Sequence, residues 1–406
     1  MAGKRVAIPY KEMALKVVGP RDVYLAARVQ RLDMTTNIPT TDIDELGNSQ
    51  HAGTTTDIPE VSATFQAYDV SVKLFAALTG TDPQAYPAAG VNIDQLQDID
   101  VIGVVKSATA ADYVKSVHLR KCRVESFTYT YSIDGESTEE YTATGSKKRW
   151  FKNDVIVDAF TGSPVTSPQT LTETAIQLKV GDYLMSCIVD GEYFDEVSGA
   201  PSTAEYSVSG TTLTFDDSGS PSNVVAVYHA NPAGDNWSDV RDASMPAAIR
   251  GRDVRPVISA NNMERVQSVT IRGTLPVERV EEMGNRDAVG YITQVPQVTG
   301  DITVLDTDTE LVALFATGQF SPSDTEFDIC EFTVSGIELK VELLDPAEGC
   351  DVDPDSRTVL KTVRIPEITI TSEGHTTNVG GNATQTFSFR SETGECIIYS
   401  GVYTPA

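Results

Sequence analysis

An internal repeat constrains this chain more than any other feature of its sequence. When the 406 residues are shifted by 237 places, residues 28–79 align with residues 265–316 without a gap, and 14 of the 52 positions are identical. Several identities fall on glycines and prolines, such as Pro39 with Pro276. These two residue types fix the backbone at turns, so their recurrence indicates the same turns in the same places. The sequence therefore predicts that one folding unit occurs twice.

Each copy contains an alternating segment followed by a short apolar stripe. The alternating apolar residues are Val61, Ala63, Phe65 and Ala67 in the first copy and Val298, Gly300, Ile302 and Val304 in the second. This pattern is typical of a strand with one buried face. The stripe that follows predicts a helix capped by Asp69 or Asp306 and ended by Gly80 or Gly318.

A hairpin is predicted near the end of each copy. In the first copy, residues 123–131 and 140–144 read as two strands around the turn Asp134-Gly135. In the second copy, residues 364–371 and 383–390 read as two strands, and we place the turn at Ser372-Glu373-Gly374.

These patterns predict a mainly β protein with three parts. Residues 1–163 and 241–406 form the two copies, each with several strands and one short helix. Residues 164–240 have no counterpart and contain short apolar segments at 206–208, 211–215 and 224–228, separated by Gly/Ser-rich turns. We interpret them as a small β insert displayed on a surface; a long extension of the last hairpin of the first copy is the alternative.

The charge excludes broad binding to nucleic acid. The chain has 58 acidic and 31 basic residues, a net charge of −27, whereas phosphate contacts come from Lys and Arg. Asp outnumbers Glu, and Arg outnumbers Lys. Such a composition suits high salt, where charge repulsion is screened, and predicts a halophilic source; an acidic mesophilic protein is the alternative. No apolar run is long enough to span a bilayer, and the start lacks the apolar core of a secretory signal, so we expect assembly in a cytoplasm.

Signals for catalysis or metal binding are weak. The four histidines are isolated, the five cysteines form no C-x-x-C pair, and no phosphate-loop or nucleophile-elbow motif occurs. A carboxylate pair acting on polysaccharide stays open as an alternative. Asp351, Asp353 and Asp355 resemble the start of a calcium loop, but Thr362 stands where the bidentate Glu is required, which favours a solvated turn.

Residues 147–152, Lys-Lys-Arg-Trp-Phe-Lys, form a basic and aromatic cluster. Such a cluster contacts nucleic acid in some proteins. In a chain this acidic we favour a contact with an acidic neighbouring subunit, with Trp150 in the core or in that interface.

The repeated unit resembles the tail-tube (major tail) proteins of siphovirus-like phages. The resemblance rests on a strand, a long polar loop with Glu-Leu-Gly-Asn, the sequence Ile-Pro-Glu-Val, an alternating strand and an acid-capped helix. These features stand at Glu45–Asn48, Ile58–Val61 and Asp69–Gly80, and they recur in the second copy. The resemblance covers both copies but not the insert.

This resemblance implies that each copy is a tail-tube-type β-sandwich or barrel with a short flanking helix, and it also implies an assembly. Six tube folds make a ring around a DNA-conducting channel, so a chain with two folds implies a trimeric ring with pseudo-sixfold symmetry. Rings stack into a tube of the virion tail, with an acidic lumen through which genomic DNA passes without specific binding. Partners would be other copies of the chain and the tail terminator, tape-measure and tail-tip proteins, with no enzyme activity, cofactor or membrane.

The polar loops at residues 33–57 and 270–294 are the predicted contacts between subunits or rings, because structureless loops of this length are usually functional or disordered. Within and beside them, the predicted contact residues are Glu45, Gly47, Asn48, Pro59, Glu282, Gly284, Asn285 and Pro296. The glycines are expected to serve backbone shape. Another virion or surface protein, such as a baseplate protein, an adhesin or a carbohydrate-binding module acting through the insert, is the alternative function.

Overall fold

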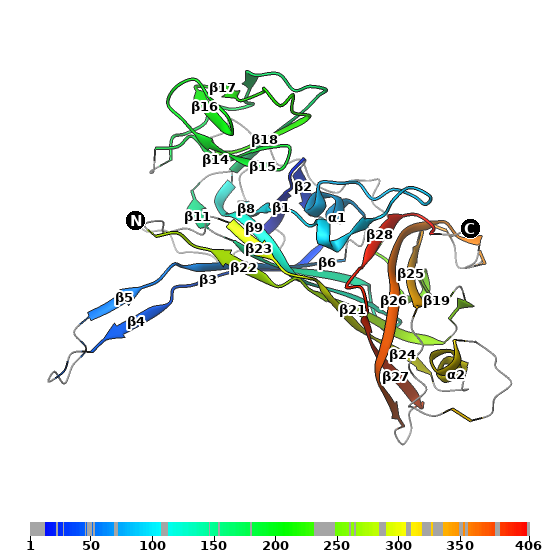
Figure 1. Cartoon of the computed structure of the whole chain (residues 1–406). Coiled ribbons are helices and arrows are strands. Elements are labelled where there is room, and N and C mark those ends of the chain that lie inside the picture. Colours follow the sequence, from blue (N-terminus) through cyan, green and yellow to red (C-terminus); the bar gives the residue numbers. More distant parts are fainter. Residues whose placement is uncertain are drawn as a thin grey trace.

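The structure is a computed structural model. It describes residues 13–403 except 22, 27, 45, 47–50, 52, 69–71, 107–112, 146, 153–154, 179–180, 231–247, 260, 264, 284–289, 306–309, 319–325, 328–335, 349–351, 354–355 and 378–381. The chain is mainly β, as predicted (Figure 1). Within the described part, no helix has the length and apolar character needed to cross a membrane.

Most strands of the first half belong to one large sheet. They are β1 (Met13–Val18), β2 (Val23–Ala26), β3 (Val29–Asn37), β6 (Glu60–Ala67), β7 (Val91–Asn92), β8 (Ile99–Lys106), β9 (Tyr113–Ser132), β10 (Thr138–Gly145) and β11 (Lys147–Phe151). The helix α1 (Val72–Thr79) follows β6, and β4 (Thr40–Ile43) with β5 (Gly53–Thr56) forms a separate hairpin.

The second half contributes the remaining strands of that sheet. They are β19 (Val254–Ile258), β20 (Asn261–Asn262), β21 (Val266–Thr274), β24 (Gln297–Leu305), β25 (Ile337–Leu344), β26 (Val359–Thr376), β27 (Thr384–Ser391) and β28 (Ile397–Ser400). The helix α2 (Glu310–Thr317) follows β24, and β22 (Val277–Val280) with β23 (Gly290–Thr293) forms a second hairpin.

Strands pair in the same antiparallel order in both halves. The first half joins β3 to β6, β6 to β10, β10 to β9, β9 to β8, and β8 to β1. The second half joins β21 to β24, β24 to β27, β27 to β26, β26 to β25, and β25 to β19. The bounds of β3, β4 and β5 become those of β21, β22 and β23 on adding 237.

The repeated Arg-Val-Gln triplet has a structural reason. Arg28 and Arg265 adopt positive φ angles of 53° and 61°, and each precedes a register shift at the start of its strand. The carbonyl of Arg28 accepts hydrogen bonds from Tyr68 N (3.2 Å) and from Gln30 Nε2 (3.1 Å). Leu305 N (3.0 Å) and Gln267 Nε2 (3.2 Å) make the same bonds to Arg265. The glutamine thus stabilises the bulge that sets the register of each strand.

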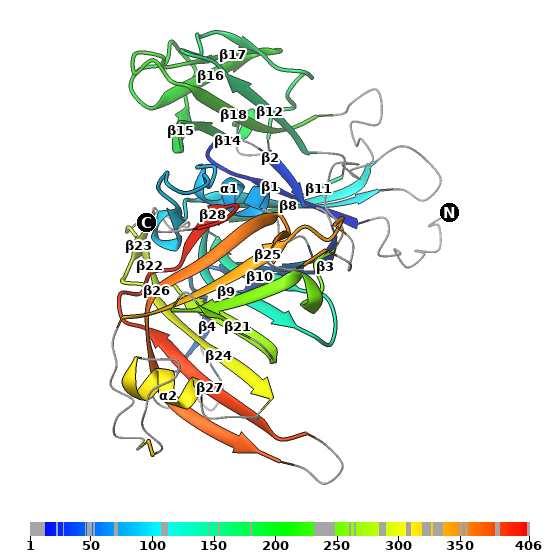
Figure 2. The same cartoon turned by 90° about the vertical axis from the view of Figure 1, so that its right-hand side faces the viewer.

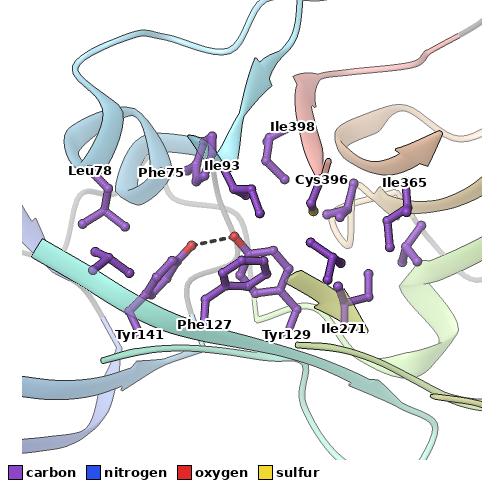
Figure 3. Close-up of a cluster of buried hydrophobic side chains, with 14 of the residues drawn as sticks. Phe75, Leu78, Ile93, Phe127, Tyr129, Tyr141, Ile271, Ile365, Cys396 and Ile398 are labelled. Atoms are coloured by element: carbon purple, nitrogen blue, oxygen red, sulfur yellow. Dashed lines mark hydrogen bonds between the residues drawn. The ribbon is translucent and has the colours of Figure 1, made fainter. Parts of the chain in front are cut away.

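A single hydrophobic core joins the halves. The large sheet curls around it into a nearly closed, barrel-like body, with β9 paired to β21 and β28 paired to β7. Figure 3 shows Phe127, Tyr129 and Tyr141 packed among residues of both halves, and the two tyrosine hydroxyls lie 3.0 Å apart. Burial raises the pKa of both tyrosines well above its usual range, so they stay neutral.

A smaller sheet forms a distinct unit at one end of the molecule (Figure 2). Its strands are β12 (Val155–Thr161), β13 (Gln169–Thr170), β14 (Leu184–Val189), β15 (Glu192–Glu196), β16 (Glu205–Ser209), β17 (Thr212–Phe215) and β18 (Asn223–His229). The last three confirm the predicted insert strands. The unit begins with β12, ahead of the boundary predicted at residue 163, because β12 pairs with β18.

The small-sheet unit is fastened to the first half through a second apolar layer. Val18 and Ile102 point from β1 and β8 toward Ile188 and Val225 of the small sheet. In addition, Tyr193 Oη donates to Asp100 Oδ1 at 2.9 Å. The unit therefore packs on the side of β1 and β8 that faces away from the main core.

Two local predictions are wrong. The segments 33–57 and 270–294 are not structureless loops, because β3 and β21 continue into them and each then forms a two-stranded hairpin. Ser372–Gly374 is not a turn but part of β26, which pairs with β27 through residue 376. The helix ends at Gly80 and Gly318 are confirmed, with φ angles of 66° and 73°, whereas the caps predicted at residues 69 and 306 lie outside the described residues.

Candidate assembly interface

The pairing of β9 with β21 is the seam between the two halves. Its register runs from Ser126 opposite Thr274 to Ser132 opposite Ser268. Just beyond the seam, Leu275 N donates to Glu125 O at 2.7 Å, and the Leu275 side chain is 4% exposed. The seam thus consists of backbone pairing plus one buried apolar anchor.

The counterparts of these two strands stand at opposite ends of the run β3–β6–β10–β9–β21–β24–β27–β26. β3, the counterpart of β21, pairs with β6 alone among the described strands. Residues 369–376 of β26 correspond to the part of β9 that pairs with β21. Within the described part, these residues pair only with β27. Among the described strands, each end therefore has an unpaired edge of the kind that is already joined inside the chain.

A β-bulge fixes the correspondence between β9 and β26. Opposite β10, the register of β9 skips Glu125, and opposite β27 the register of β26 skips Thr371. Glu125 and Thr371 are therefore equivalent positions. Their neighbours Val124 and Ile370 are equivalent too, yet Val124 is 1% exposed whereas Ile370 is only partly buried.

The two hairpin arms differ in their surroundings. We call β4–β5 the first arm and β22–β23 the second arm. Arg279 of the second arm contacts the first half, donating from Nη2 to Pro59 O at 3.4 Å and lying 3.7 Å from Glu60 Oε1. Tyr291 of the same arm is partly buried, which raises the pKa of its hydroxyl. The first arm instead projects away from the body and is almost entirely exposed (Figure 1).

The predicted contact residues lie on or beside these arms. Glu45, Gly47, Asn48, Gly284 and Asn285 lie outside the described residues. Glu282 and Pro59 are exposed and Pro296 is partly buried, and they remain predicted contacts, with Pro59 already accepting a bond from the second arm. The predicted contacts leave out the apolar residue that lies between the glutamate and the glycine of each copy. These two equivalent residues, Leu46 and Met283, are fully exposed at 108% and 106%.

In the run β3–β6–β10–β9–β21–β24–β27–β26, the face of the sheet that points away from the core is polar, and no described element is seen to pack on it. Its partly exposed side chains are mostly serines and threonines, and they pair across strands, as Thr64 does with Thr142 (3.2 Å between hydroxyl oxygens). Arg272 of this face pairs with Asp301 at 2.6 Å. Partial burial tends to raise the pKa of Asp301, but the pairing with Arg272 outweighs burial and lowers this pKa, so the acid stays ionised. The face is therefore rich in hydroxyls, and its Arg272 is neutralised in place.

The basic and aromatic cluster forms β11. Trp150 is 58% exposed, so it does not lie in the core. It lines a cavity of about 510 Å³ together with Ile176, Leu178 and His229 of the small-sheet unit. Lys148 Nζ lies 5.4 Å from the Trp150 ring and donates to Met34 O at 2.6 Å, so this cation is engaged within the chain.

Metal and redox chemistry gain no support from the described residues. No group of three or more His, Cys, Asp or Glu side chains among them could hold a metal ion, and Asp351 and Asp355 lie outside that part. Cys122, Cys187 and Cys396 are buried free thiols, and burial raises the pKa of Cys396 to about 12.

No known protein family matches this chain, and no curated protein sequence resembles it significantly. The assignment of function therefore depends on the strand edges, the arms and the polar face.

Proposed function

We propose that this protein is a tail-tube subunit of a siphovirus-like virus, with residues 1–154 and 241–406 as two copies of one tube fold. The observation that carries this proposal is the pair of open edges at the two ends of the eight-strand run. Inside the chain, the equivalents of these edges are already joined as β9 and β21. Repeating that junction between chains joins the end of one molecule to the start of the next.

Such a contact is heterologous and head-to-tail, so it closes a ring when the rotation at each seam divides a full turn. Sixfold repetition of the fold gives three chains and six folds per ring. Ring closure also pairs both edges, which a β-rich chain must otherwise protect. The arms provide contacts between neighbouring chains or between stacked rings.

In this ring the polar face of the sheet lines the channel. The core and both helices lie behind the opposite face, and the small-sheet unit lies beyond them on the outer side of β1 and β8. That bulk fits only on the outside of the ring, where the circumference is larger. The channel wall is then rich in hydroxyls and carries few charged side chains, with Arg272 paired to Asp301 and Arg390 exposed. A wall with so few cations offers DNA few of the phosphate contacts that release counterions, so DNA passes without adhering. The small-sheet unit decorates the outer surface of the tail.

Negative-stain microscopy of the concentrated protein, across low and molar salt, tests the proposal. The expected result is hollow tubes of stacked rings, with trimers as the smallest assembled species by mass photometry. Small compact particles under all salt conditions would contradict it. Deleting residues 155–230 adds a second test, because a tube subunit without its outer unit should still polymerise, whereas an adhesin would lose its ligand.

A further inference from the structure

The base of the first arm differs in exposure from its counterpart. Ile38 follows β3 as Leu275 follows β21, 237 residues later. Leu275 is 4% exposed and lies against the first half, whereas Ile38 is 55% exposed. The residue that corresponds to the buried anchor of the internal seam is therefore exposed, and it lies beside the free edge of β3.

At the other end of the strand run, the residues equivalent to those that receive Leu275 are less buried. Leu275 donates its backbone N–H to Glu125, next to the buried Val124. The equivalents of these acceptor residues are Thr371 and Ile370, at the same bulge, and Ile370 is only partly buried. One end of the strand run thus carries an exposed apolar side chain, Ile38. The other end carries Ile370 and Thr371, which are equivalent to the residues that Leu275 contacts within the chain.

We propose that Ile38 of one chain packs on Ile370 of the next chain, with Ile38 N–H donating to the Thr371 carbonyl and the first arm lying across the second half of that neighbour. The occupant is a second copy of this chain, because the internal seam supplies the template for the contact. The contact deepens the ring proposed above and rests on it. It also sets the register, in which Thr35 and Gly374 face each other as Arg272 and Thr128 do within the chain.

The positions of the two arms indicate which neighbouring chain the first arm contacts. The second arm already lies over the first half of its own chain, held by Arg279 at Pro59 and Glu60. The same displacement applied to the first arm carries it beyond the end of its own chain. It therefore reaches the neighbour, which accounts for the almost complete exposure of β4 and β5 in the single chain.

The test combines a disruptive variant with a cross-link in the full-length chain. Ile38→Asp should weaken ring formation about tenfold or more per seam, because it removes an apolar burial worth one to two orders of magnitude in affinity. Its thermal unfolding as a monomer should match that of the wild type. Ile176→Asp, in the small-sheet unit, is the control with the same substitution and should assemble normally.

The double variant Ile38→Cys, Thr371→Cys should form disulfide-linked dimers and trimers under oxidation, whereas each single variant should not. These two positions belong to opposite ends of the strand run, so the bond must form between chains. Tubes that form without this cross-link and survive Ile38→Asp would overturn the contact while leaving the tube function standing. Failure of the wild-type chain to associate at any salt concentration would overturn both.

Discussion

A buried ion pair joins the two halves of the large sheet. Lys361 of β26 places its Nζ 2.5 Å from Glu139 Oε1 of β10, and both side chains are buried. Tyr141 Oη also donates to Glu139 (3.2 Å), and the Tyr129 ring lies 5.2 Å from the ammonium. Neither charge reaches water, so each depends on the other for compensation.

Replacing Lys361 by Met keeps much of the side-chain volume but strands the Glu139 carboxylate in the core. Removing one partner of a buried pair costs about 3–5 kcal/mol, because the remaining charge is uncompensated. That is a large part of the roughly 5–15 kcal/mol by which a domain is stable.

The double variant Glu139→Gln, Lys361→Met removes both charges and should recover most of the lost stability. The structure supports Gln at this position. Glu139 lies opposite Ala67 of β6, and the equivalent pair in the second half places Gln385 opposite Val304 of β24. Gln385 is buried, so a glutamine is accommodated there. Arg31→Met is the control, since Arg31 pairs with Asp33 on the exposed edge, where ion pairs contribute little.

Urea unfolding followed by circular dichroism and by fluorescence measures these effects. The single variant should unfold at a clearly lower urea concentration with an unchanged slope, and the double variant and control should stay near the wild type. The reasoning fails if Lys361→Met is as stable as the wild type, or if the double variant is as unstable as the single one.

Three further predictions concern the anchoring of the small sheet, the seam and the polar face. Burial opposes ionisation of Asp100, but the charge and hydrogen bond of His118 outweigh burial and lower the Asp100 pKa. The stabilisation that ionised Asp100 gives the fold is therefore complete above the unfolded pKa of about 4 and is lost as pH falls through the folded pKa. Asp100→Asn should destabilise the protein at pH 7 and flatten this acid dependence in urea titrations. Gly273→Ala places a Cβ 1.9 Å from the Phe127 ring and should cost about 1–3 kcal/mol in the same assay, whereas Gly290→Ala, with open space around it, should be neutral. Thr130→Cys should react in assembled tubes with a small maleimide but not with a large polymer-linked one; equal reaction with both would place the polar face outside.

The sequence repeat predicted more of this fold than any other feature. The alternating strands at Val61 and Val298 and the glycine helix ends were predictable because their patterns are local. The arms were misjudged as loops because Thr- and Asp-rich strands such as β4 have no buried face, and hence no apolar alternation to detect.

The seam could not be predicted from local patterns. Its strands are far apart in sequence, and its chemistry depends on which edge meets which. One signal was nevertheless present, since Ser126, Thr128, Thr130 and Ser132 alternate with Phe127, Tyr129 and Tyr131 and so define a hydroxyl face opposite an aromatic one. The predicted contact residues, in contrast, rested on resemblance, and five of the eight lie outside the described part of the chain.

The internal seam and the open edges differ in polarity, and the difference has a physical reason. Inside the chain, Phe127 stands opposite Gly273, and the aromatic ring fills the space that glycine leaves in the core. At the open ends, the equivalent residues are Glu373 and Thr36, both polar. An apolar edge would promote random pairing of free chains, whereas a charged or hydroxylated edge keeps them apart until the correct register forms. In the proposed ring, each seam between chains is therefore weak alone, and the ring is favoured only when all of its seams close together. Glu373→Phe should accordingly increase irregular aggregation and not tube yield.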